Sequence, residues 1–231
     1  MFLVIDDMEL SQDQYTTYMS DGELMSFGRD GISYLWSNAE IPVTFDDATI
    51  AVSSSGRQLV EGTMSEMNKE LCGCFHFRYI HGHRIEVCKF FNSYLIQFHF
   101  RPAKLSDFNR VLIKNDPREE KNVCQSYVGM QNGTQDLQLG DGCFKKKVVQ
   151  HELLHSAGIY HEHARPDRDE YIHVNEDCIM SDEMHKNFKI QETARTYGLA
   201  YNPKSIMHYD SKSGAGKGCR TITSKVHFVF M

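Results

Sequence analysis

The feature that most constrains the fold of this chain is a short run in which histidines recur at helical spacing. His151 and His155 lie four residues apart, so both imidazoles project from one face of an α-helix, with Glu152 beside them. Gly158 follows, and glycine tolerates the positive φ at which a helix ends and the chain reverses. His161 can then reach the same point from outside the helix. The run predicts a helix over about 146–157 that stops at Gly158, with three imidazoles around one metal ion.

The types of ligand indicate a catalytic zinc ion and not a structural one. Structural zinc is closed by four protein ligands, usually including cysteine, whereas a catalytic site keeps one position open. Three histidines with a neighbouring glutamate match the open kind, and we expect one Zn²⁺ per chain. Zinc lowers the pKa of its bound water towards about 7, and Glu152 is placed to take the proton. The alternative, a helix that merely carries surface histidines, leaves Gly158 and His161 as coincidences.

Two complete motifs resemble those of the astacin family of metzincin endopeptidases. The first runs from His151 to His163 and continues into an Arg-Pro-Asp-Arg-Asp sequence, and the second is Ser205–Tyr209. Glu162, directly after the third histidine, separates astacins from other metzincins, so a different metzincin subfamily is the weaker alternative. The resemblance covers residues from about 34 to 222.

The resemblance implies a role for each residue of the site. His151, His155 and His161 would bind zinc, and Glu152 would act as general base and then as proton donor. Tyr209 would be a fifth, movable zinc ligand that swings away and stabilises the oxyanion, a role that suits a phenol O–H. The implied function is zinc-dependent hydrolysis of peptide bonds in extracellular proteins through a zinc-activated water.

The implied fold is α+β in two lobes, with a twisted mixed sheet and two long helices above an irregular C-terminal lobe. Met207 would form a turn beneath the metal, and Glu162 would be buried and reach the N-terminus of the mature enzyme. Leu137, Gln138 and Leu139 are expected at the edge of the sheet, where an unpaired strand would pair with an extended substrate.

Hydrophobic periodicity adds the other elements. Apolar residues at helical spacing predict an amphipathic helix over 53–71. Short alternating or apolar runs predict strands. The four strand candidates are 41–45, 75–77, 110–113 and 137–139. Beyond the second helix there is little periodicity.

The N-terminal residues 1–29 are interpreted as the remnant of a propeptide, and residues 30–231 as the catalytic domain with an incomplete C-terminus. The run Val4–Ser11 is similar to the Phe-x-Gly-Asp signature of astacin propeptides, with Val4 and Asp6 in place of Phe and Gly. The match would make Asp7 the zymogen switch, a carboxylate at the open zinc position. The alternative is an acidic surface patch. Cleavage near Arg29 would activate the enzyme.

One tetrapeptide, Phe-His-Phe-Arg, occurs twice, at 75–78 and at 98–101. Removing residues 79–101 leaves a plausible strand and an even number of cysteines, which indicates an insertion in a loop. The alternative is an ordinary long surface loop.

Seven cysteines suggest disulfides, and with them a secreted protein in an oxidising compartment. The resemblance pairs Cys124 with Cys143. It also implies that the partner of Cys74 would lie in a C-terminal segment that is expected to be missing from this sequence. Cys72, Cys178 and Cys219 have no assignment. The apolar start is too short for a signal peptide, so the leader is expected to be missing from this sequence.

The expected partners are protein or peptide substrates. A net charge of −6 argues against nucleic acid, and no apolar run is long enough to span a membrane. Two alternatives to an active protease are a catalytically silent zinc-binding fragment and a translated sequence that does not fold.

Overall fold

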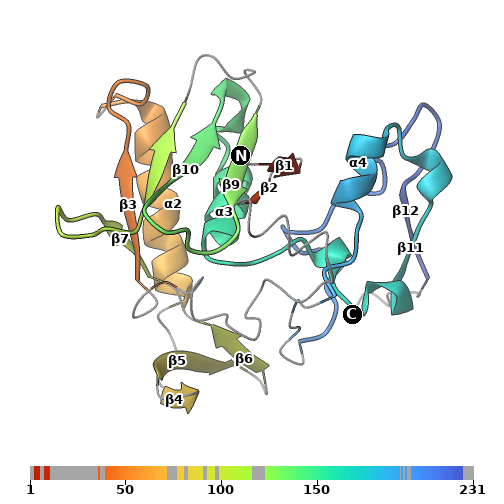
Figure 1. The fold of residues 1–231 in the computed structure, drawn as a ribbon, viewed down its shortest axis with the longest axis horizontal. Coiled ribbons are helices and arrows are strands. Elements are labelled where there is room, and N and C mark those ends of the chain that lie inside the picture. Colours follow the sequence, from red (N-terminus) through yellow and green to blue (C-terminus); the bar gives the residue numbers. More distant parts are fainter. Residues whose placement is uncertain are drawn as a thin grey trace.

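The computed structural model describes residues 3–5, 8–10, 36, 40–51, 53–71, 77–80, 83–90, 93–96, 99–115, 123–192, 194, 196 and 199–225. A mixed sheet with two helices forms one part of the molecule, and an irregular part with one short helix lies beside it (Figure 1). The expected α+β architecture is confirmed. None of the described helices is long and apolar enough to cross a membrane.

The main sheet has the strand order β1-β2-β9-β10-β8-β3-β7. Its strands are β1 Leu3–Ile5, β2 Met8–Leu10, β9 Cys124–Tyr127, β10 Thr134–Leu139, β8 Arg110–Lys114, β3 Glu40–Phe45 and β7 His99–Pro102. The strands from β10 to β7 run parallel, whereas β9 is antiparallel to β10. Both long helices, α2 Ser55–Leu71 and α3 Lys146–Ser156, pack against this sheet and against each other (Figure 1).

Both helices follow from their apolar spacing. In α2 the side chains of Val60, Met64 and Met67 are buried, as expected for residues three and four apart on one face. In α3 the corresponding buried residues are Val149 and Leu153. These side chains form one core with the strand residues Ile41, Val43, Val111, Ile113, Leu137 and Leu139. The packing fixes α3, and therefore the histidine motif, against the sheet.

The prediction that Leu137, Gln138 and Leu139 lie at the sheet edge is wrong. Their strand β10 pairs with β8 on one side and with β9 on the other, and all three residues are buried. The alternation of residues indicated a strand, but it carried no information on which strands lie next to it. β9, which the sequence did not predict, covers that edge.

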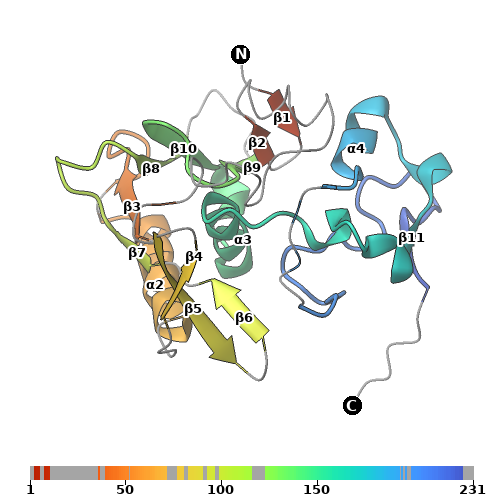
Figure 2. The same cartoon turned by 60° about the horizontal axis from the view of Figure 1, so that its bottom comes forward.

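Of the strand expected at 75–77, residues 75 and 76 lie outside the described residues, and it is the second copy of the tetrapeptide that contributes a strand to the main sheet. Strand β7 pairs with β3 in the main sheet, whereas Phe77 belongs to β4 in a separate three-stranded sheet. That sheet consists of β4 Phe77–Ile80, β5 His83–Phe90 and β6 Ser93–Ile96, and both cartoons draw it near the C-terminal end of α2 (Figures 1 and 2). Because the two tetrapeptides are identical, the sequence alone could not tell which copy belongs to the main sheet. An insertion at 79–101 stays a prediction, and residues 99–101 of that range lie in the main sheet.

The C-terminal part is built from turns around a small core. Its elements are α4 Asp182–Asn187, the antiparallel strands β11 Ile172–Val174 and β12 Ile222–Ser224, and the 3₁₀ helices Glu162–Ala164, Arg168–Glu170 and Glu176–Cys178; a further 3₁₀ helix, Asp141–Cys143, precedes α3. The core residues are Ile172, Ile179, Phe188, Tyr201 and Ile222. The low periodicity beyond α3 correctly indicated this irregular lobe.

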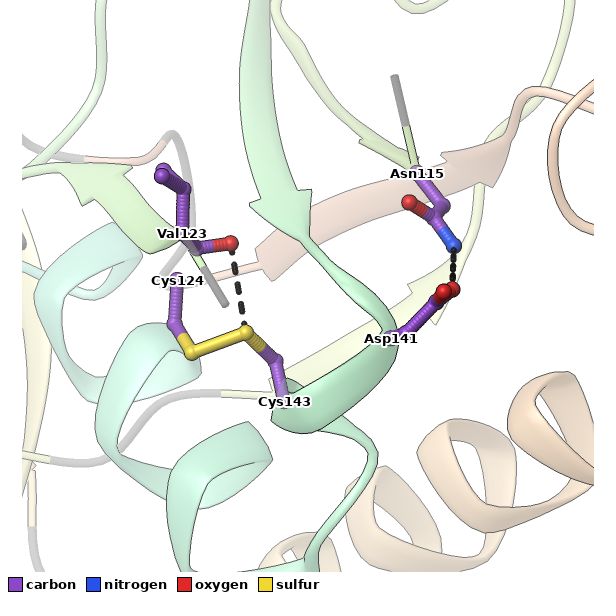
Figure 3. The surroundings of a disulfide bond; sticks show 5 residues. All are labelled: Asn115, Val123, Cys124, Asp141 and Cys143. Atoms are coloured by element: carbon purple, nitrogen blue, oxygen red, sulfur yellow. Dashed lines mark hydrogen bonds between the residues drawn. A yellow bond between two sulfur atoms is a disulfide. The ribbon is translucent and has the colours of Figure 1, made fainter. Parts of the chain in front are cut away.

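Two disulfides join segments of the described chain. Cys124 and Cys143 are bonded, as the resemblance implied, and this bond connects the start of β9 to the turn before α3 (Figure 3). Beside it, Asn115 Nδ2 donates to Asp141 Oδ1 at 3.0 Å. Cys178 and Cys219, which the sequence left unassigned, form the second bond.

Replacing Cys178 and Cys219 together by serine is expected to lower the free energy of unfolding by about 4 kcal/mol, because the bond closes a long loop and so restricts the unfolded chain. The sequence separation is 41 residues, against 19 for Cys124 and Cys143, whose double serine variant should lose about 3 kcal/mol. Denaturant titrations without reductant measure both. Unchanged stability of the Cys178/Cys219 variant would contradict this expectation.

Candidate active site

The histidine helix ends as the motif requires. Gly158 has φ 101°, and its N–H donates to the carbonyl of His155 at 2.8 Å. Ile159 N donates to the carbonyl of Leu154 at 3.0 Å, so the last turn is closed by the reversing chain. This reversal carries the third histidine back towards the helix.

The three imidazoles converge on one point. The Nε2 atom of His161 lies 3.2 Å from Nε2 of His151 and 3.2 Å from Nε2 of His155. Among the residues that the structure describes, these three form the one group of at least three potential ligands whose donor atoms all lie within 4.8 Å. A tetrahedral zinc ion with Zn–N bonds of about 2.0–2.1 Å would separate its ligand nitrogens by about 3.3 Å. The observed spacing fits zinc.

Hydrogen bonds on the far side of two rings fix their tautomer. His151 Nδ1 lies 2.8 Å from the carbonyl oxygen of Ile206, and His155 Nδ1 lies 2.8 Å from that of Ile159. A carbonyl oxygen only accepts, so both Nδ1 atoms carry the proton and both Nε2 atoms present lone pairs to the centre. Such outer partners orient metal ligands and raise their basicity.

Substituting Gly158 by alanine is expected to weaken zinc binding by roughly tenfold, because the left-handed backbone costs a non-glycine residue about 1–2 kcal/mol. The strain falls between His155 and His161, so relaxation moves one ligand away from the other two. Gly133→Ala is the matched control, with φ 105° and open space around an added Cβ. Competition with a chromogenic zinc chelator measures the affinity. Equal affinities for the two variants would contradict the expectation.

Glu152 lies beside the ligands on α3 and is 1% exposed. Its helix is held in place by a link from the core. Trp36 Nε1 donates to the carbonyl of Ser156 at 2.7 Å, and the hydroxyls of Ser156 and Ser126 lie 2.7 Å apart. The histidine helix is therefore tied to β9, the strand that borders the site.

The second motif is bonded to the first along its main chain. The Ile206 carbonyl accepts from His151, the Met207 carbonyl accepts from Glu162 N at 2.8 Å, and Tyr209 N donates to His163 Nδ1 at 3.3 Å. Met207 is buried, and the Tyr209 ring centroid lies 4.7 Å from that of His161. The structure thus brings the predicted site residues of both motifs together.

Glu162 is held by neighbours from the C-terminal part. Its Oε1 accepts from Arg165 Nη1 at 3.1 Å and from Asn202 N at 2.7 Å. Arg165 in turn pairs with Asp167, whose pKa it holds below the usual range through a hydrogen bond. The side chain of Glu162 is 17% exposed and therefore only partly buried. Its implied contact with a mature N-terminus stays a prediction.

The sequence gave no role to His163 and His208, and the structure places both beside Tyr209. His163 is fully buried and stacks on the Tyr209 ring. Burial, and then the neighbouring His161, hold the pKa of His163 well below its usual range. His208 Nε2 lies 2.7 Å from the hydroxyl of Tyr201. No local pattern distinguishes such residues, because their burial depends on partners up to 46 positions away.

Asp7 lies outside the described residues. The segment that follows it is described: β2 runs parallel to β9, with Met8 opposite Ser126 and Glu9 opposite Tyr127. β2 therefore covers the outer edge of β9, beside the histidine helix (Figure 1).

Comparisons with known proteins agree with this geometry. A family model described as Astacin, a peptidase family, matches residues 87–229. The zinc metalloproteinase nas-6 of Caenorhabditis elegans is 43% identical over 100 residues, which are 43% of this chain and 29% of nas-6. Nas-13 of the same organism is 28% identical over 224 residues, which are 92% of this chain and 42% of nas-13. The chain thus spans less than half the length of either relative.

The fold has a counterpart among solved structures. High choriolytic enzyme 1, a hatching enzyme zinc-protease from Oryzias latipes (medaka fish), matches with a TM-score of 0.64 at 22% identity. The match covers 85% of this chain and 83% of the fish enzyme. Because the family model covers more than half of the chain and includes both motifs, the chain belongs to the astacin family of peptidases, and its three histidines form a zinc site.

Proposed function

We propose that this chain is a zinc endopeptidase that hydrolyses peptide bonds in extracellular proteins. The observation that carries the proposal is a buried glutamate, Glu152, next to three converging imidazoles, with a phenol from Tyr209 at their side. A glutamate that is 1% exposed beside a metal site is shielded from bulk water, which favours a role in proton transfer.

Zinc bound by His151, His155 and His161 supplies a Lewis acid that polarises the scissile carbonyl and lowers the pKa of the attacking water. Glu152 accepts the proton of that water and then delivers it to the leaving amine nitrogen. The protons on Nδ1 of His151 and His155 stay on those nitrogens, which donate them to carbonyl oxygens, so neither ring competes for the transferred proton.

Tyr209 supplies the donor for the developing oxyanion. The Tyr209 ring centroid lies 4.7 Å from that of His161, and a phenol O–H beside the metal ligands would donate to negative charge that appears only in the transition state. The same oxygen is the proposed fifth zinc ligand of the resting enzyme.

The substrate main chain is proposed to pair with β9. This strand is antiparallel to β10 on its inner side, and its outer side accepts a strand, since β2 pairs with it there. An extended peptide added to this edge gains main-chain hydrogen bonds without any demand on its sequence. A peptide at this edge would also lie near α3, the helix that carries Glu152, because Ser126 of β9 contacts Ser156 of α3.

The N-terminal segment is proposed to keep the enzyme latent. β2 occupies the edge that a substrate needs, and Asp7, the residue before Met8, is proposed as the switch that ligates zinc. Cleavage near Arg29 would release both contacts.

The test is hydrolysis of a quenched casein substrate after limited trypsin treatment of the full chain. We expect activity that a zinc chelator abolishes and that stoichiometric zinc restores. Zinc bound at one ion per folded chain without any hydrolysis would overturn the proposal in favour of a catalytically silent zinc-binding protein.

A further inference from the structure

The buried imidazole of His163 contacts the rings of both a zinc ligand and the proposed oxyanion donor. Its ring centroid is 5.0 Å from that of His161, with the planes 23° apart, and 4.1 Å from that of Tyr209, with the planes 29° apart. Phe188 closes the group, at 5.6 Å from His163 and 5.8 Å from Tyr209. The phenol ring therefore rests on an imidazole face that is inaccessible to water.

The hydrogen bonds of His163 connect α4 to the main chain of Tyr209. Tyr209 N–H donates to Nδ1 at 3.3 Å, and Nε2 lies 3.0 Å from the carbonyl oxygen of Asn187, the last residue of α4. An amide nitrogen only donates and a carbonyl oxygen only accepts, so both bonds together require a neutral ring with its proton on Nε2. His163 itself is held by Arg168 Nη1, which donates to its carbonyl at 3.2 Å.

This link completes the attachment of the second motif to the first. His151 and Glu162 hold the carbonyls of Ile206 and Met207, both on the N-terminal side of the phenol. The bond from His163 acts on the main chain of Tyr209 itself. With the main chain fixed and the ring lying on a flat partner, the phenol moves chiefly by rotation of its own side chain.

We propose that His163 is a positioning residue for Tyr209, which sets where the phenol oxygen lies relative to the three zinc ligands through one main-chain hydrogen bond and one stacked ring. The inference rests on the proposed function, in particular on the role of Tyr209.

Three substitutions separate the two contributions. His163→Asn can place its amide oxygen where Nδ1 accepts from Tyr209 N, His163→Gln can place its amide nitrogen where Nε2 donates to Asn187, and His163→Phe keeps only a ring face. For activated protein we expect kcat of His163→Phe to fall by roughly 10- to 100-fold with KM within about twofold, since a displaced oxyanion donor acts only in the transition state. His163→Asn should recover more of kcat than His163→Gln.

A binding measurement adds a readout that does not depend on turnover. The Kd of a phosphinic peptide, which mimics the tetrahedral transition state, should rise in His163→Phe by the same factor as kcat/KM falls. Zinc content and the melting transition of each variant identify any protein that has lost metal or fold. The Asn and Gln variants keep the test valid if His163→Phe does not fold.

A double-mutant cycle with Tyr209→Phe decides between positioning and general stability. Tyr209→Phe alone should lose about 100-fold in kcat, and adding His163→Phe should then cost less than about twofold. If both single variants are impaired and their losses multiply, His163 does not act through Tyr209 and the inference is overturned while the proposed function stands. If Tyr209→Phe has parental kcat, the proposed role of Tyr209 fails and the inference fails with it.

Discussion

Glu152→Gln in the activated enzyme is expected to lower kcat/KM by roughly 10³- to 10⁴-fold while one zinc ion per chain is retained. Glutamine has the shape of glutamate but cannot accept the proton of the attacking water or return one to the leaving amine. Because Glu152 is 1% exposed on the buried side of α3, bulk water cannot take its place as a base. The zinc ligands are untouched, so the loss belongs to proton transfer and not to metal binding. Hydrolysis of a quenched peptide measures the loss of kcat/KM, and the zinc content of the same sample shows whether the metal is retained.

Glu66→Gln is the matched control for this experiment. It makes the same chemical change on α2, where Glu66 forms an ion pair with Lys146 of α3 at 2.6 Å and is 45% exposed. A pair of this kind stabilises by about 1 kcal/mol or less, so activity should stay at the parental level. A Glu152→Gln variant with more than about a tenth of parental kcat/KM would remove Glu152 from the role of general base.

The sequence was sufficient to predict those features that depend on local geometry. The spacing of His151, His155, Gly158 and His161 predicted a helix, its end and a three-histidine cluster, and each of these is present because helix periodicity and a positive-φ glycine act within one turn. The amphipathic pattern was sufficient to predict helix α2 for the same reason.

The sequence was insufficient where the outcome depends on pairing between distant segments. Leu137 could be placed on a strand but not at an edge or in an interior, because the neighbours of β10 are set by the turn that brings β9 alongside. Two identical tetrapeptides left the position of β7 open for the same reason.

Distant contacts also decide which side chains are buried. The bond between Cys178 and Cys219 joins segments that no local pattern relates, and the burial of His163 depends on residues 24 and 46 positions away. The site residues that can be named from a motif are therefore the three metal ligands, the proposed base Glu152 and the proposed oxyanion donor Tyr209. Those that orient the ligands and the phenol need the folded chain.

Asp7→Asn in the full-length chain is expected to raise activity before trypsin treatment by at least about tenfold. An amide binds zinc less strongly than a carboxylate, and a loss of about 1.4 kcal/mol from an intramolecular blocking segment releases the site tenfold more often. The pairing of β2 with β9 stays the same in the variant, since the paired residues are Met8 and Glu9. The comparison thus separates the carboxylate from the strand that blocks the edge.

Asp6→Asn is the matched control, because it makes the same change of charge one position earlier in an acidic pair. If the two aspartates only form an acidic surface patch, both variants should behave alike and neither should change latent activity. The two proteins should also become indistinguishable from the parent after complete trypsin cleavage, when the segment has been removed. Activity that rises in Asp7→Asn alone, and only before cleavage, places the switch at Asp7; equal activities before cleavage would leave the occupied β9 edge as the sole cause of latency.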